Sequence, residues 1–286
     1  MPARPVSELP APALRAALEL ARAATSPATI SAGSLPQATG DFGAPASPPP
    51  SFPPAAIHVA DLAAAAGYSP HHFSRMFSAT MGISPAQYVG ALRIDTAKRL
   101  LLATDLPVID IATAIGFDSL SSFARRFRES VGIPPAGLRG LADSVAATTL
   151  TPFSIYRGLS APDSEVLVRL RFPDRDPAFG PAEPRATWLG WFSHPYPVGM
   201  PTAGTLTWKD ELALPLCPGS PWLLAYSVPI TEEAADVLAP TRPLVAIGPA
   251  PIFSPGHPVE LELRRAKEFS VPMLPALPNL RSSAAR

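Results

Sequence analysis

Two short segments of the sequence place an arginine between two phenylalanines. Segment 73–77 reads FSRMF and segment 123–127 reads FARRF. Phenylalanines four residues apart share one face of a helix, and the residue midway between them lies on the opposite face. A guanidinium on an exposed helical face can donate two parallel hydrogen bonds to phosphate oxygens or to the edge of a guanine base. Arg75 and Arg125 are therefore the first candidates for binding chemistry.

Histidine and cysteine form no comparable pattern. His71 and His72 are adjacent, so their side chains diverge around a helix by about 100° and are poor joint metal ligands. His58, His194 and His257 are isolated. We therefore expect no metal site.

Catalytic motifs are also missing from the sequence. A glycine-rich phosphate loop, a nucleophile elbow and an HExxH pattern are all absent. The single cysteine, Cys217, excludes an intramolecular disulfide, and we expect it to be a small apolar core residue. We expect neither enzymatic activity nor a cofactor.

Each arginine segment lies in a helix that is predicted to follow a glycine turn. A helix beginning at Val59 stops at Gly67, and Ser69-Pro70 starts the next one, with the Ser69 side chain expected to accept an orphan amide. The second pair repeats this order: helix 108–115 ends at Gly116, and Asp118-Ser119 caps the helix that follows. The sequence predicts helix, tight turn, helix, twice.

The two copies are connected by a longer predicted helix. Ser84 and Gln87 form a capping-box signal, and an apolar stripe continues to about Leu102. A duplicated helix-turn-helix with a rigid connection suits double-stranded DNA, because two recognition helices can enter successive major-groove segments about 34 Å apart.

Residues 57–140 resemble the DNA-binding domain of AraC/XylS-type bacterial transcription regulators, which is a double helix-turn-helix. The likeness rests on a dense set of positions. They are Leu62-Ala63, Gly67, Ser69, Phe73, Arg75, Phe77, Gly82, Pro85, Tyr88, Arg93, Ala97, Ile111-Ala112, Gly116-Phe117, Phe123, Arg125, Phe127, Gly132, Pro135 and Arg139.

The resemblance assigns roles to further side chains of this domain. It places base contacts at His71, Ser74, Arg75, Leu120, Ser121, Ala124 and Arg125. Hydroxyl and guanidinium groups can contact phosphates, helped by the amides at helix N-termini, and the candidates are Ser69, Ser119, Ser122, Arg128 and Arg139. Leu120 and Ala124 are apolar where polar side chains are common, and Leu138 replaces the usual tyrosine near the end of the domain.

Charge in this region is nearly balanced. Residues 55–150 carry 8 basic and 7 acidic side chains, so we expect modest nonspecific DNA affinity and a shallow salt dependence. Arg93 and Arg99, on the connecting helix, are expected to pair within the chain. The phenylalanines are expected to form the core.

The N-terminal segment 1–56 contains 12 of the 39 prolines and is predicted to be largely disordered. One exception is a possible short isolated helix over 11–24, where Leu14, Ala17, Leu18 and Ala21 recur at helical spacing. The double helix-turn-helix domain is placed at 57–142.

Beyond residue 151 helical periodicity gives way to alternation. Val166, Val168, Leu170 and Phe172 point to one side, which is the period of a half-buried strand. Further strands are predicted over 186–192, 204–208, 221–228, 244–247 and 259–264. We expect an antiparallel β-sandwich over 151–268 that regulates or assembles, followed by a disordered tail over 269–286.

The predicted architecture is therefore multidomain, all-α followed by all-β. The chain is expected to be a cytoplasmic, sequence-specific transcription regulator. Its expected partner is double-stranded DNA, and RNA polymerase and a small-molecule effector of the C-terminal domain are candidate partners; no membrane partner is expected. The alternative is a carbohydrate-binding or protein-interaction sandwich carrying a nonspecific helical DNA-binding domain. Segment 188–196, rich in aromatics with polar tips, fits either a ligand surface or the sandwich core.

Overall fold

The computed structural model describes residues 8–26, 57–146, 151–156, 164–173, 185–197, 199–229, 238–240 and 243–276. The chain divides into two compact units, Met1–Ala124 and Arg125–Arg286. This division falls inside a helix, whereas the sequence places its domain boundary between residues 142 and 151.

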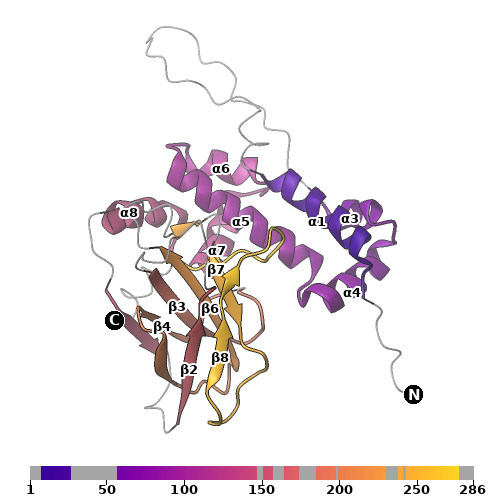
Figure 1. The fold of residues 1–286 in the computed structure, drawn as a ribbon. Coiled ribbons are helices and arrows are strands. Elements are labelled where there is room, and N and C mark those ends of the chain that lie inside the picture. The colour runs from indigo at the N-terminus through magenta and orange to yellow at the C-terminus, as the bar shows by residue number, and fades with distance from the viewer. Residues whose placement is uncertain are drawn as a thin grey trace. The chain divides into compact units, whose positions relative to one another are not determined.

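The first part of the chain is helical (Figure 1). Its elements are α1 (Ala11–Thr25), α3 (Val59–Ala65), α4 (Pro70–Met81), α5 (Pro85–Ala103), α6 (Val108–Ala114), α7 (Leu120–Val131) and α8 (Pro135–Ala146).

Glycines end the two short helices as predicted. Gly67 follows α3 with φ 78°, and Gly116 follows α6 with φ 80°, a left-handed conformation that costs glycine little. Ser84 Oγ accepts a hydrogen bond from the Gln87 backbone amide, and the Ser84 backbone amide donates to Gln87 Oε1, so the predicted capping box starts α5. These local signals fix where α4, α5 and α7 begin.

The N-terminal helix is not isolated, and in this respect the prediction is wrong. Helix α1 packs against α3 and α5 and buries Ala17, Leu18, Ala21 and Thr25 (Figure 1). The stripe is visible in the sequence, but the surface that covers it is formed by residues that follow a long proline-rich stretch. Residues 27–56, also predicted to be disordered, lie outside the described residues.

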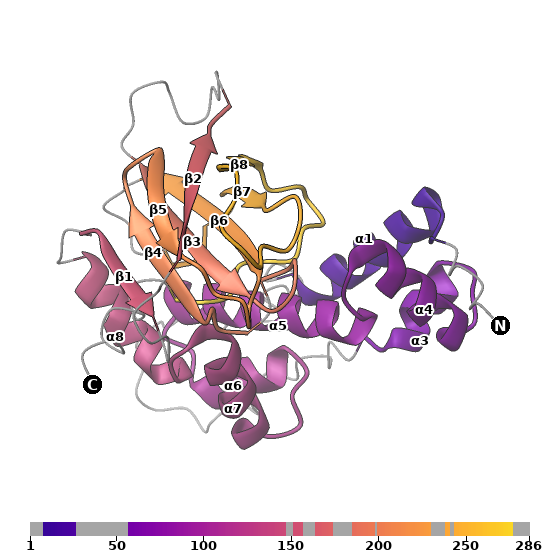
Figure 2. The same cartoon turned by 90° about the horizontal axis from the view of Figure 1, so that it is seen from below.

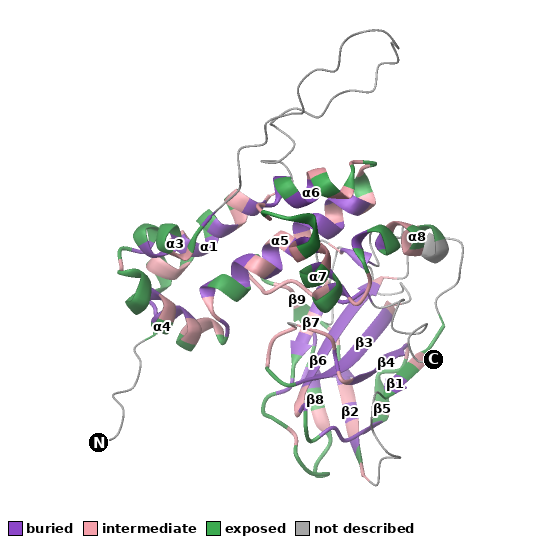
Figure 3. Cartoon of the chain, turned by 180° about the vertical axis from the view of Figure 1, so that it is seen from behind, coloured by how far each residue is buried: buried purple, intermediate pink, exposed green. Residues whose placement is uncertain are grey.

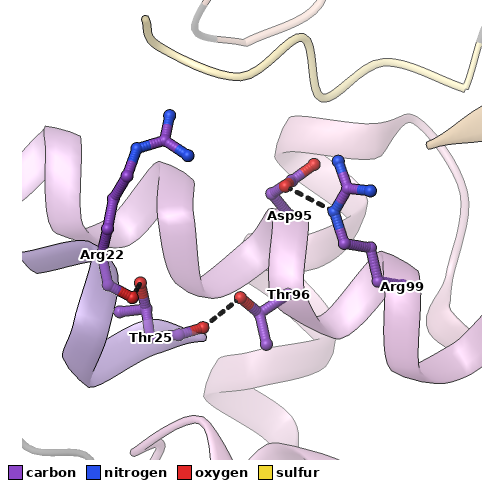
Figure 4. Close-up of polar contacts among 5 residues, drawn as sticks. All are labelled: Arg22, Thr25, Asp95, Thr96 and Arg99. Carbon is purple, nitrogen blue, oxygen red and sulfur yellow. Dashed lines mark hydrogen bonds and ion pairs between the residues drawn. The ribbon is translucent and has the colours of Figure 1, made fainter. Parts of the chain in front are cut away.

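Polar contacts hold both ends of α1. The Leu9 amide donates to Thr80 Oγ1 at 2.8 Å, and the Thr96 hydroxyl of α5 donates to the Thr25 carbonyl (Figure 4). Burial raises the pKa of Tyr88 on α5, and a hydrogen bond and positive charge from Arg22 of α1 work against that shift. Helix α1 is thus part of the same helical unit as the first arginine segment.

Changing Leu18 to aspartate should release α1. Leu18 is 4% exposed, and a carboxylate at this position would have to enter an apolar contact between helices. We expect the free energy of unfolding of the helical unit to fall by about 2 to 4 kcal/mol. Urea unfolding should be followed by far-UV circular dichroism, which reports on helices. Tryptophan fluorescence does not report on this unit, because all four tryptophans follow residue 187.

Leu20→Asp is the matched control, because Leu20 lies on the exposed side of α1 at 36%. Its expected effect is below about 0.5 kcal/mol. Equal losses for the two variants would show that α1 does not dock as described.

The second part of the chain is rich in strands (Figure 2). They are β1 (Phe153–Tyr156), β2 (Glu165–Arg171), β3 (Arg185–Phe192), β4 (Ala203–Thr207), β5 (Glu211–Pro215), β6 (Trp222–Pro229), β7 (Leu244–Ile247), β8 (Val259–Glu262) and β9 (Arg264–Arg265). Within the described residues one sheet has the order β1-β4-β3-β6-β7-β9 and the other β5-β2-β8.

Buried side chains of both sheets form one cluster. Val166, Val168 and Leu170 of β2 join Leu189 and Trp191 of β3 in it, as the alternation along β2 predicts. A second cluster around Trp188 lies on the six-stranded sheet, whose central strands are buried along their length (Figure 3). The region fits a β-sandwich.

Two features of the strand-rich region differ from the predictions. The pairing is not wholly antiparallel, because β2 and β8 run parallel. The tail is also not disordered from residue 269, since Leu274 and Ala276 are buried and the Ala276 amide donates to the Val131 carbonyl at 2.9 Å. Residues 277–286 of the predicted tail lie outside the described residues.

Candidate nucleic-acid interface

Helix α4 turns its arginine away from the core. Phe73 and Phe77 are fully buried, with ring centroids 5.4 Å apart, while Arg75 and His71 are exposed. Within the described part of the chain Arg75 makes no ion pair. Its guanidinium is therefore available to an external acceptor.

The two serines at the start of α4 differ in their hydrogen bonds. Ser69 occupies the N-cap position as predicted, but its exposed side chain does not make the predicted capping hydrogen bond. The Pro70 ring at the first helical position removes one orphan amide without help from Ser69. Ser74 is half-buried and donates to the Pro70 carbonyl at 2.8 Å, which competes with any external contact.

Helix α7 starts with a small hydroxyl network. Ser119 Oγ accepts from the Ser122 amide at 3.3 Å and lies 3.3 Å from Ser121 Oγ. Ser122 in turn donates to the Ser119 carbonyl at 3.1 Å. These three predicted contact residues therefore lie together at one helix start, where Leu120 is 41% exposed and Ala124 is half-buried.

Basic side chains cover the outer side of α7. Arg125 and Arg128 are exposed, opposite the buried Phe123 and Phe127. Arg125 Nη1 lies 3.4 Å from Glu129 Oε1 one turn later.

Arg126 is a residue that the sequence analysis missed. It is exposed, although its position corresponds to Met76 of α4, which is buried. An arginine in a place where the other copy has a core methionine is itself the signal that this part of α7 faces outward. Arg126 adds a third positive charge to the surface that carries Arg125 and Arg128.

Three other arginines are engaged within the chain. Arg93 donates to the Ile57 carbonyl at 3.2 Å, and Arg99 pairs with Asp95 at 3.0 Å (Figure 4), so their predicted internal roles are confirmed. Arg139, on α8, is half-buried and has a partner inside the chain. Leu138 beside it is fully buried, so the substitution at this position serves the core.

The aromatic segment 188–196 divides between core and surface. Trp188 and Trp191 are buried together with their indole nitrogens, which favours the core interpretation. His194 and Tyr196 stack at 5.2 Å outside the strand. Cys217 is buried in the shared cluster, as predicted, and burial raises the pKa of its thiol.

Metal ligands and membrane helices were searched over the described ranges. No group of three or more histidine, cysteine, aspartate or glutamate side chains is placed to hold a metal ion there. In those same ranges no helix has the length and apolar character needed to cross a bilayer.

Comparison with known proteins identifies a helix-turn-helix domain over residues 62–140. The transcriptional activator AarP of Providencia stuartii is 41% identical over 80 residues, which are 28% of this chain and 59% of that protein. The transcriptional regulator YobQ of Bacillus subtilis is 38% identical over 79 residues, or 28% of this chain and 33% of that protein. The chain thus spans less than two thirds of either relative.

A solved structure also matches part of the chain. It is the DNA-binding domain of the global transcriptional factor AdpA in complex with a target DNA, with 31% identity and a TM-score of 0.31. The match covers 32% of this chain and 84% of that one. The strand-rich region lies beyond the end of the family match at residue 140.

Proposed function

Since residues 62–140 form a helix-turn-helix domain of the AraC type, we propose that this chain regulates transcription by binding a specific DNA sequence. Helices α4 and α7 act as its two recognition helices and enter successive segments of the major groove. Arg75 and Arg125 lead the base contacts, each bidentate to a guanine.

One observation carries this proposal. Both helices bury two phenylalanines on one side and expose an arginine, at the same position of the repeat, on the other. Core packing accounts for the phenylalanines but gives no reason for the two exposed arginines to match. Base readout does, because each guanidinium would reach its groove from the same place on its helix.

Neighbouring residues supply the other contacts. His71, Ser121 and Leu120 are exposed beside the arginines and meet base edges, with Leu120 suited to a thymine methyl group; Ser74 and Ala124 line the same faces. Ser69, Ser119, Ser122, Arg128 and Arg139 contact phosphates. Ser69 is the best placed of the serines, because its hydroxyl makes no cap bond.

The strand-rich region regulates or assembles the protein. A small-molecule effector would act there, and RNA polymerase would be the partner through which bound protein changes transcription. A regulator of this kind works in the cytoplasm, where bacterial DNA lies.

The test begins with selection of binding sites from random-sequence duplex DNA. Arg75→Ala and Arg125→Ala should each weaken binding to the selected site by about 1 to 3 kcal/mol, or about 5- to 150-fold. Fluorescence anisotropy at fixed salt measures both affinities.

Arg15→Ala is the matched control. Arg15 on α1 is exposed and pairs with Glu19 one turn later, as Arg125 pairs with Glu129. Its change should leave affinity for the selected site unaltered. Failure of the wild-type chain to prefer any sequence over random duplex would contradict the proposed function.

A further inference from the structure

The two arginine helices differ four residues after the arginine. On α7 that residue is Glu129, whose Oε1 lies 3.4 Å from Arg125 Nη1. On α4 the equivalent residue is Ala79, which is exposed and has no charge. The repeat thus contains one arginine that has an acidic neighbour on its own helix and one that has none.

The pair of Arg125 and Glu129 contributes little to the stability of α7. Both side chains are exposed, at 68% and 59%, and ion pairs in water of this kind are weak. The order is also the less favourable one, since glutamate stabilises a helix best when it precedes its basic partner. Glu129 lies in the last turn of α7, where the helix dipole disfavours negative charge. Helix stability therefore gives no account of this carboxylate.

Binding of DNA changes the surroundings of Glu129. To reach a guanine edge, the Arg125 guanidinium must give up its contact with the carboxylate. The carboxylate then remains on the helix face that approaches the phosphates, where its charge opposes association. Arg126 and Arg128, both exposed on α7, partly offset that charge.

We infer that Glu129 is a positioning residue that holds Arg125 back from DNA and weakens readout by α7 relative to α4. The inference rests on the proposed function, because it assigns unequal strength to the two proposed recognition helices. The half-site read by α4 then dominates specificity, and the half-site read by α7 tolerates more sequence variation.

Glu129→Gln tests the inference directly. We expect affinity for the selected DNA site to rise about two- to fivefold at low salt, which is the strength of one exposed ion pair, and the salt dependence to steepen by up to about one counterion. Ala79→Glu, the reciprocal change, should lower affinity by a similar factor through Arg75. The free energy of unfolding of Glu129→Gln should equal or exceed that of the wild type, which a merely structural role would not produce.

The double variant Arg125→Ala, Glu129→Gln locates the effect. If Glu129 acts through Arg125, the gain from Glu129→Gln becomes smaller when Arg125 is alanine, and only the part that comes from repulsion between the carboxylate and the phosphates remains. A gain that persists in full would overturn the positioning role. So would unchanged affinity of Glu129→Gln alongside clear losses for Arg75→Ala and Arg125→Ala, and that pattern would leave the proposed function standing. Absence of any sequence preference in the wild type would instead refute the proposed function.

Discussion

Replacing Gly204 with alanine is expected to destabilise the strand-rich region by about 3 kcal/mol or more. Gly204 is the second residue of β4 and lies directly opposite Gly190 of β3. A Cβ at this position would overlap Trp188 Cζ2 and would lie 2.5 Å from the Leu189 carbonyl oxygen. The carbonyl cannot move without breaking the sheet, so the added methyl group must displace both the indole and the strand.

Displacing Trp188 costs free energy because its side chain is tightly packed. Its indole is 1% exposed and packs with Ile155, Leu206 and Tyr226 on one face of the six-stranded sheet. Tryptophan fluorescence during urea unfolding reports on this region, because all four tryptophans belong to it. The transition of Gly204→Ala should move to a markedly lower urea concentration.

Gly219→Ala is the control for the loss of glycine itself. No heavy atom lies within 4 Å of the position that its Cβ would take. Its free energy of unfolding should be unchanged or slightly higher, because alanine reduces the conformational entropy of the unfolded chain. A second variant, Trp188→Leu with Gly204→Ala, should lose less stability than the sum of the single changes. Additive losses, or equal effects at 204 and 219, would contradict the proposed contact.

Helix boundaries were largely predictable because their signals are local. Gly67 and Gly116 end helices through their own φ values, and Ser84 with Gln87 starts one through side chains three residues apart. The exposure of Arg75 and Arg125 follows equally from the spacing of the phenylalanines around them. Such features need no knowledge of distant parts of the chain.

The missed elements depend on distant partners. Strands β1 and β5 have only four and five residues, and they exist because they pair with β4 and β2. The parallel pairing of β2 with β8 joins segments separated by most of the strand-rich region. Residues 269–276 have no periodicity, yet Leu274 and Ala276 are buried. Composition alone predicts disorder for such a segment, since it cannot reveal the surface that buries it.

The same limit applies within the candidate site. Ser69 has the right residue type and occupies the N-cap position, but its side chain makes no capping hydrogen bond. Arg126 follows the core spacing of Met76 and is nevertheless exposed. In both cases residue type sets what a side chain can do, and packing around it decides what it does.

Lys98 should make the stability of the helical region depend on pH. Its side chain is fully buried on α5, and this burial lowers its pKa from 10.5 to about 8; Asp95 opposes the shift and Arg99 adds to it. Below pH 8 the lysine is charged in both the folded and the unfolded chain, so folding bears the whole cost of burying the charge. Between pH 8 and 10.5 the unfolded chain binds more protons than the folded one, and the contribution of Lys98 to stability therefore rises with pH.

The full rise from this one group amounts to about 3 kcal/mol, since one pKa unit corresponds to about 1.4 kcal/mol. Lys98→Met keeps the length of the apolar stem and removes the titrating amine. Urea unfolding, followed by circular dichroism at pH 7, 8, 9 and 9.5, gives the free energies of unfolding of the wild type and the variant. The contributions of all other titrating groups cancel in their difference. We expect the free energy of unfolding of the wild type to rise steadily above pH 8 relative to that of the variant. Parallel curves would mean that the ammonium group is solvated in the folded chain, and burial of Lys98 on α5 would then be wrong.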